Sequence, residues 1–205
     1  MGRRYSAVLK FLRHEIVPID VEESLRQRQS AYRTSDAILL CTPTDEHVRG
    51  LFEIGDLGAR HIPILCEKPI STDLVDVKRV CNWARQSGFN LQMVNQYEHI
   101  SGFSTENRGK SFYHYFNSGR DGLAYDCINI LGLAKDGCEL SNESHVWRCR
   151  INGSFLKLKD MDHAYVNMIE SWLKRPLPNL DYILHAHQRA HDYDTKHQSS
   201  HRRPG

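Results

Sequence analysis

The residue of this sequence that is best placed for catalysis is a lysine that directly follows an apolar run. Lys68 stands in the sequence Glu67-Lys68-Pro69, immediately after the strand-length apolar stretch of residues 62–66. Polar residues at the carboxyl ends of parallel strands lie on the edge where open α/β sheets bind ligands. A lysine there can neutralise negative charge on a substrate oxygen and position a hydroxyl group. The alternative interpretation is a solvated loop lysine, with Pro69 ending the strand.

A second polar turn has the same placement relative to an apolar run. Thr42-Pro43-Thr44 closes the run of residues 37–41, and His47 follows three residues later. Such a fully apolar run is typical of a parallel strand that is buried on both faces. We therefore expect this turn and Glu67-Lys68-Pro69, here called the lysine turn, to share one edge of a sheet.

The elements that must position these turns alternate along the first half of the chain. Apolar residues recur at helical spacing in three segments: 2–12, 45–58 and 73–87. Strand-length apolar runs occupy 37–41 and 62–66, and residues 91–95 are another strand candidate. We also expect a short strand at 15–21, a surface helix or loop at 24–32, and helix ends at Gly58 and Gly88. This alternation predicts an α/β fold with a Rossmann-like parallel sheet covered by helices.

The pattern changes after Asn95. Residues 98–110 are polar and contain glycine, which indicates a linker. The segments that follow are a strand at 111–116, a helix at 123–133, two strands within 145–158 and a helix at 160–173. Asn152-Gly153 is a strong hairpin signal. We predict a Rossmann-like domain over 1–97, a small α+β domain over 98–180 and a polar, histidine-rich tail over 181–205.

Composition excludes several classes of protein. The chain has 205 residues and a formal net charge of +2, so it lacks the basic field that binds nucleic acid. It has neither a membrane-length apolar stretch nor the apolar core of a signal peptide, and we expect a cytoplasmic protein without membrane partners. The six cysteines form no C-x-x-C pair and are expected to be buried thiols. The five histidines between His185 and His201 match no zinc spacing, so we predict a solvated tail and no metal site.

Residues 37–71 together resemble the Gfo/Idh/MocA oxidoreductases, nicotinamide-dependent dehydrogenases that act mostly on sugars, inositols and related polyols. The resemblance rests on the strand, the Thr-Pro-Thr turn with its histidine, the helix ending at glycine, and the strand that runs into Glu-Lys-Pro. It implies that Lys68 polarises the substrate oxygen, and that Asp126 orients Lys68 or the substrate.

The N-terminus resembles the end of the family's glycine-rich turn and the helix after it. Gly2 occupies the place of the third glycine, with Arg3 and Arg4 near enough for phosphate contact. Asp20, about 20 residues on, is expected to bind the ribose hydroxyls, which favours NAD over NADP; its alternative is a helix or turn cap. The first strand and two glycines of the fingerprint do not precede Gly2. Either the start lies upstream or dinucleotide binding is weak.

The resemblance implies both a cofactor site and a catalytic pair. The cofactor-binding residues it implies are Gly2, Arg3, Asp20, Thr42, Pro43, His47, Glu67 and Asn95. The family places a histidine four residues after the acid, whereas Ile130 follows Asp126 here; Tyr125 or His114 is a candidate substitute. We therefore predict an NAD(P)-dependent oxidoreductase that transfers a hydride to or from a sugar- or polyol-like substrate and forms a homo-oligomer. The alternative is a catalytically degenerate relative that binds ligands or proteins.

Overall fold

A three-stranded parallel sheet forms the centre of the molecule. The computed structural model describes residues 2–20, 22–100, 112–115, 122–133, 139–141, 148–151, 154–155 and 158–201. The strands are β1 (Ile38–Leu40), β2 (Ile64–Cys66) and β3 (Leu91–Met93), in the order β1-β2-β3. Each of the three lies within a segment from which a strand was predicted. The parallel sheet predicted from the sequence is confirmed.

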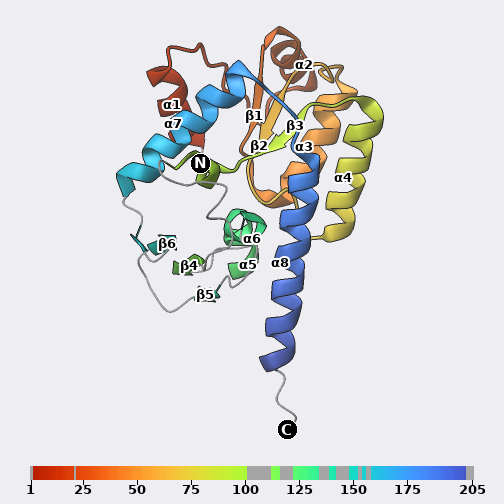
Figure 1. Cartoon of the computed structure of the whole chain (residues 1–205). Coiled ribbons are helices and arrows are strands. Elements are labelled where there is room, and N and C mark those ends of the chain that lie inside the picture. Colours follow the sequence, from red (N-terminus) through yellow and green to blue (C-terminus); the bar gives the residue numbers. More distant parts are fainter. Residues whose placement is uncertain are drawn as a thin grey trace.

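Helices cover both faces of this sheet (Figure 1). On one face lie α1 (Gly2–Phe11) and α7 (Leu158–Lys174), with Leu65 of β2 among the residues they bury. On the other lie α3 (Thr44–Asp56), α4 (Leu74–Ser87) and α8 (Leu180–His201), which pack on Ile64 and Cys66. Neighbouring residues of β2 thus serve opposite faces, which confirms the Rossmann-like fold class.

Local sequence signals fix the helix ends. Asp73 caps α4 by accepting a hydrogen bond from the Val75 N–H at 2.8 Å, and Gly88 ends it in the left-handed conformation with φ of 67°. Ser24 and Gln27 form a capping box at the start of α2 (Leu25–Thr34). Of the two alternatives for residues 24–32, the structure therefore shows the helix.

The second unit is a small mixed sheet beside two short helices. Its strands are β4 (Phe112–Tyr115), β5 (Glu139–Ser141), β6 (Arg148–Ile151) and β7 (Ser154–Phe155), in the order β5-β4-β6-β7. The helices are α5 (Leu123–Asp126) and α6 (Ile128–Leu133). β6 and β7 pair antiparallel as predicted, although Asn152 and Gly153 lie outside the described residues. β5 was not predicted.

The predicted strand at 15–21 is wrong. Residues 14–20 have no regular secondary structure, and residue 21 lies outside the described part. Pro18 supplies no N–H to a strand ladder, which confines proline to edge positions of sheets.

The predicted loose tail is also wrong, because residues 180–201 form α8. Ile183, Ala186, His187 and Ala190 are buried. A Cβ added to Gly132 of α6 would lie 2.7 Å from the Ala186 Cβ, so the two helices approach closely at small residues.

No helix of the described residues is long and apolar enough to cross a membrane. The same residues contain no cluster of three or more potential metal ligands.

Candidate active site

The structure brings Lys68 and Asp126 together at the carboxyl edge of the sheet. Lys68 is half-buried beyond β2, and its Nζ donates a hydrogen bond of 2.8 Å to the main-chain carbonyl oxygen of Asp126 in α5. The Lys68–Pro69 peptide bond is cis. The link between the predicted catalytic pair is thus made by the backbone of Asp126.

Glu67 ties the first turn of α1 to the end of β2. The Tyr5 hydroxyl donates to Glu67 Oε1, and the Lys68 N–H donates to Glu67 Oε2 at 2.9 Å. Burial, and then the charge of Glu67, raise the pKa of Tyr5. The Glu67 carboxylate is therefore engaged by protein donors on both oxygens.

A tyrosine pair extends this contact toward α7. The Tyr5 and Tyr165 rings meet edge to face with centroids 5.8 Å apart, and the Arg4 guanidinium lies 4.9 Å above the Tyr165 ring. Burial raises the pKa of Tyr165 to about 12. Arg3 and Arg4 are both exposed on this turn, and Arg4 packs on an aromatic face.

His47 joins the two polar turns. It lies buried in the first turn of α3, after the exposed Pro43 at the N-cap. Its Nδ1 lies 2.7 Å from the Pro69 carbonyl oxygen, and its Nε2 lies 2.8 Å from the Thr42 carbonyl oxygen. The expectation that both turns share one edge of the sheet is confirmed.

Two polar side chains at this edge lack partners within the described part of the chain. Asn95 follows β3 and is 4% exposed, yet neither its Oδ1 nor its Nδ2 makes a hydrogen bond there, and the buried Thr42 Oγ1 is in the same state. Buried unpaired polar atoms cost free energy that a polar ligand can recover.

The first turn of α1 reaches the same edge, since a Cβ on Gly2 would lie 3.4 Å from Cys41 Sγ. Amides at a helix N-terminus favour anionic groups. These residues fit a nicotinamide dinucleotide.

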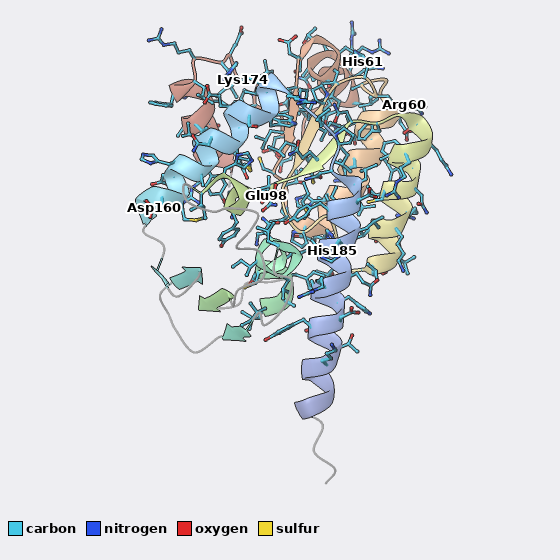
Figure 2. The ribbon with its side chains drawn as sticks, in the orientation of Figure 1. Arg60, His61, Glu98, Asp160, Lys174 and His185 are labelled. Carbon is cyan, nitrogen blue, oxygen red and sulfur yellow. The ribbon has the colours of Figure 1, made fainter. Side chains whose placement is uncertain are left out.

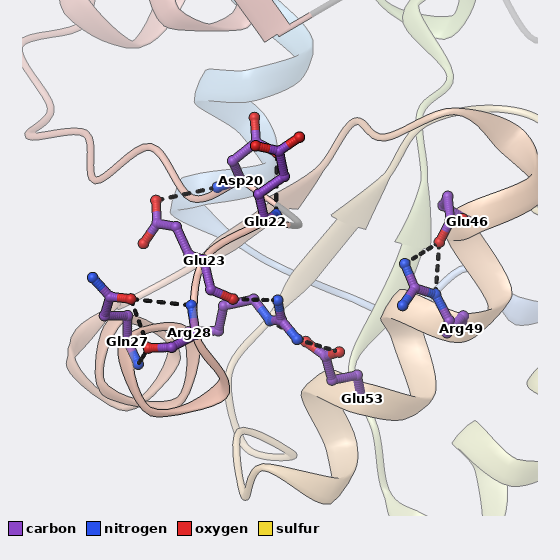
Figure 3. A network of polar contacts seen from close by, with 9 residues as sticks. Asp20, Glu22, Glu23, Gln27, Arg28, Glu46, Arg49 and Glu53 are labelled. Atoms are coloured by element: carbon purple, nitrogen blue, oxygen red, sulfur yellow. Dashed lines mark hydrogen bonds and ion pairs between the residues drawn. The ribbon is translucent and has the colours of Figure 1, made fainter.

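The structure does not bring Asp20 to this edge. Asp20 is exposed, and its Oδ1 accepts a hydrogen bond of 3.4 Å from the Glu22 N–H, as in the alternative of a turn cap. The nearby Arg28 of α2 forms a 2.8 Å ion pair with Glu53, close to the C-terminal end of α3 (Figure 3). That end of α3 faces the amino edge of the sheet, where Arg60 and His61 also lie (Figure 2).

One of the two candidate substitutes for the family histidine, Tyr125, makes a structural hydrogen bond. Ile130 is 1% exposed in the core, so its position offers no polar group. The Tyr125 hydroxyl donates to the Thr72 carbonyl oxygen at 2.8 Å. The His114 side chain lies outside the described residues.

Sequence reasoning missed a buried polar cluster beneath the site. Asn129 of α6 donates to Gln96 Oε1 at 3.1 Å and accepts a 3.0 Å hydrogen bond from the Tyr182 hydroxyl of α8. An asparagine inside an apolar helical run is a signal that could have indicated it. Tyr5 and His187 were missed as well, and nothing in the sequence around His187 sets it apart from the other C-terminal histidines.

Solved structures resemble this fold, although no family model and no curated protein matches the chain. The WlbA dehydrogenase from Thermus thermophilus, solved with NAD and UDP-GlcNAcA, matches with a TM-score of 0.66 at 14% identity, over 93% of this chain and 90% of that chain. A Gfo/Idh/MocA family oxidoreductase from Vibrio cholerae matches at 0.65 and 12% identity, over 98% and 88%. A myo-inositol dehydrogenase from Corynebacterium glutamicum matches at 0.62 and 14% identity, over 83% and 81%. The fold of this chain is that of the Gfo/Idh/MocA oxidoreductases, which confirms the resemblance predicted from its two strand-end turns.

Proposed function

We propose that this chain is an oxidoreductase that moves a hydride between a nicotinamide cofactor and the carbinol carbon of a sugar- or polyol-like substrate. The observation that carries the proposal is the placement of Lys68, held by the Asp126 carbonyl at the sheet edge where Asn95 and Thr42 present unpartnered buried polar atoms. The three solved structures reported above are dehydrogenases or oxidoreductases, and two of them name a nucleotide sugar acid or an inositol in their descriptions.

In this proposal Lys68 acts on the substrate oxygen. An ammonium carries three donors, and within the described residues one of them is directed to the Asp126 carbonyl oxygen. The others are left to hydrogen-bond a substrate hydroxyl and to stabilise negative charge on its oxygen as the hydroxyl proton leaves to water and the hydride leaves the carbon. The hydrogen bond to the Asp126 carbonyl oxygen holds the ammonium beyond the carboxyl end of β2.

The remaining residues hold the cofactor. Asn95 and Thr42 would bind polar groups of the nicotinamide end, and the first turn of α1 from Gly2, with Arg3, would face the phosphates. When bound, the nicotinamide supplies the hydride acceptor or donor. Asp20 does not support a preference for NAD, because it lies with α2 at the far edge of the sheet. Binding of NAD and of NADP must therefore both be measured. Homo-oligomerisation and a cytoplasmic location stay predictions.

The experiment combines binding with turnover. Wild-type chain is titrated calorimetrically with NADH and NADPH, and then assayed with NAD+ and NADP+ against inositols, hexoses and nucleotide sugars. Lys68→Ala is compared with Lys78→Ala, which removes an exposed lysine of α4. We expect dinucleotide binding in all three proteins and turnover that Lys68→Ala alone abolishes. Binding without turnover would support the degenerate ligand-binding alternative, and equal rates for the two variants would exclude Lys68 from the chemistry.

A further inference from the structure

One peptide group next to Lys68 is held on both sides by buried histidines. The carbonyl oxygen of Pro69 and the N–H of Ile70 belong to the same peptide unit. His47 Nδ1 lies 2.7 Å from that carbonyl oxygen, and His187 Nε2 accepts a hydrogen bond of 3.0 Å from that N–H. The histidines come from different helices, α3 and α8, and each is 1% exposed.

The hydrogen bonds of His187 fix its tautomer. An N–H group can only donate, so the Nε2 that faces Ile70 carries no proton. The proton is on Nδ1, which donates to the Ile183 carbonyl oxygen at 2.7 Å within α8. Burial lowers the pKa of His187 to about 4, which keeps the ring in this neutral form at physiological pH. His187 therefore acts as an acceptor anchored to its own helix.

His47 has the opposite chemistry. Its two ring nitrogens face two carbonyl oxygens, of Pro69 and Thr42, so the ring can only donate here, and a neutral ring donates from one nitrogen at a time. A proton on Nδ1 holds the peptide after Lys68, and a proton on Nε2 holds the Thr42 turn.

These contacts complete the fixation of the lysine backbone. On the preceding side, the Lys68 N–H is bound by Glu67 Oε2 at 2.9 Å. On the following side, the Pro69–Ile70 peptide is bound at its oxygen and at its nitrogen. We propose that His47 and His187, here called the histidine pair, are positioning residues that hold this peptide and thereby aim the Lys68 ammonium at the substrate. This inference rests on the proposed function, but its structural half can be tested without turnover.

Amide substitutions separate this role from simple packing. Asparagine places its amide where histidine has Nδ1, and glutamine places its amide near the position of Nε2. At 187, glutamine keeps the contact to Ile70 and asparagine keeps the contact to Ile183. At 47, asparagine keeps the contact to Pro69 and glutamine keeps the contact to Thr42. The same two residue types thus give opposite expectations at the two sites.

The first readout is steady-state kinetics. We expect the kcat of His187→Gln to exceed that of His187→Asn by about tenfold or more, and the kcat of His47→Asn to exceed that of His47→Gln by a similar factor. The KM for the dinucleotide should differ within each pair by less than about threefold. His185 is exposed on α8, so His185→Gln and His185→Asn serve as controls and should not differ. The same order of asparagine and glutamine at both sites, or equal kcat within each pair, would overturn the proposal.

The second readout is amide hydrogen exchange, which needs no substrate. The Ile70 amide should exchange at least tenfold faster in His187→Asn than in His187→Gln. The Ile64 amide, which donates to the Asn90 carbonyl oxygen at 2.8 Å inside the sheet, reports global opening and should exchange equally in both. If kinetics show no turnover even in the wild type, the proposed function fails, while the exchange ratio still decides whether the histidine pair holds this peptide. Equal Ile70 exchange in the two variants would refute that role.

Discussion

The Nζ atom of Lys68 lies 2.8 Å from the main-chain carbonyl oxygen of Asp126, so their contact does not depend on the Asp126 carboxylate. We expect Lys68→Ala to lower kcat by roughly a hundredfold or more, because it removes a donor that stabilises charge in the transition state. Asp126→Ala keeps the carbonyl oxygen and should lower kcat less than Lys68→Ala does. Steady-state kinetics of the two variants, with circular dichroism melts to show that both are folded, measure the difference.

An inverted order would show that the Asp126 side chain contributes more to the reaction than the lysine it was predicted to orient. Lys68→Arg is an informative companion, since arginine keeps the charge but not the compact ammonium.

Asn95 and Asn129 should respond oppositely to the same substitution. Asn95→Leu removes buried amide atoms that lack protein partners in the described part, so we expect the free energy of unfolding to rise by about 1 kcal/mol. Asn129→Leu removes the hydrogen-bond partner of Gln96 Oε1 and of the Tyr182 hydroxyl. It should lower the free energy of unfolding by about 1–3 kcal/mol. Urea denaturation measures both changes.

Calorimetry gives the functional half of this prediction. If Asn95 binds the nicotinamide end, Asn95→Leu should weaken NADH binding by about tenfold, which corresponds to one lost hydrogen bond. A variant that is more stable and binds NADH as well as the wild type would remove Asn95 from the cofactor site.

The sequence predicted the elements whose signals are local. The apolar runs that contain β1 and β2 and the periodic helices α3 and α4 carry their patterns in adjacent residues. Gly88 marks a helix end by the conformation it permits. The strand-end turns followed from these elements, and the contact of His47 with both turns agrees with that reading.

Elements that depend on distant contacts were not predicted. Of the four fully buried residues of α8, Ile183, Ala186, His187 and Ala190, only Ile183 is large and apolar, so the sequence shows little of the apolar stripe that reveals an amphipathic helix. Residues 15–20 have the composition of a strand, but a strand needs a partner and a donor at each ladder position, and Pro18 provides none. The Lys68 contact to a backbone carbonyl is equally invisible in side-chain identities.

Acid should destabilise the fold through His187. Its pKa is lowered by burial to about 4, against about 6.5 in the unfolded chain, so between these values the unfolded state binds a proton that the folded state excludes. The stability present above pH 6.5 is therefore lost as the pH falls to 4, by up to about 3 kcal/mol. His187→Gln, which cannot titrate, should show a smaller loss over this range in urea denaturation at pH 7, 5.5 and 4. Parallel losses in the two proteins would assign the acid sensitivity to other groups.

The contact between α6 and α8 leaves no room for a methyl group. A Cβ on Gly132 would lie 2.7 Å from the Ala186 Cβ and 3.2 Å from the Ala186 Cα, so we expect Gly132→Ala to lower the free energy of unfolding by about 1–3 kcal/mol. Ala186→Gly alone should cost about 1 kcal/mol through helix propensity. Because the double variant relieves the overlap, its cost should be smaller than the sum of the two single costs, as a thermal double-mutant cycle measures. Strict additivity would mean that the cost of Gly132→Ala does not arise from overlap with the Ala186 Cβ.

The hydrogen bond between Ile70 and His187 spans 117 residues of sequence. A ribosome that adds 5–20 residues per second needs on the order of ten seconds to synthesise that interval. The lysine turn therefore emerges early with the first sheet strands, but it acquires its last anchor only when α8 leaves the exit tunnel. A nascent chain halted before that point would carry the three parallel strands, but the Ile70 N–H would lack its contact to His187.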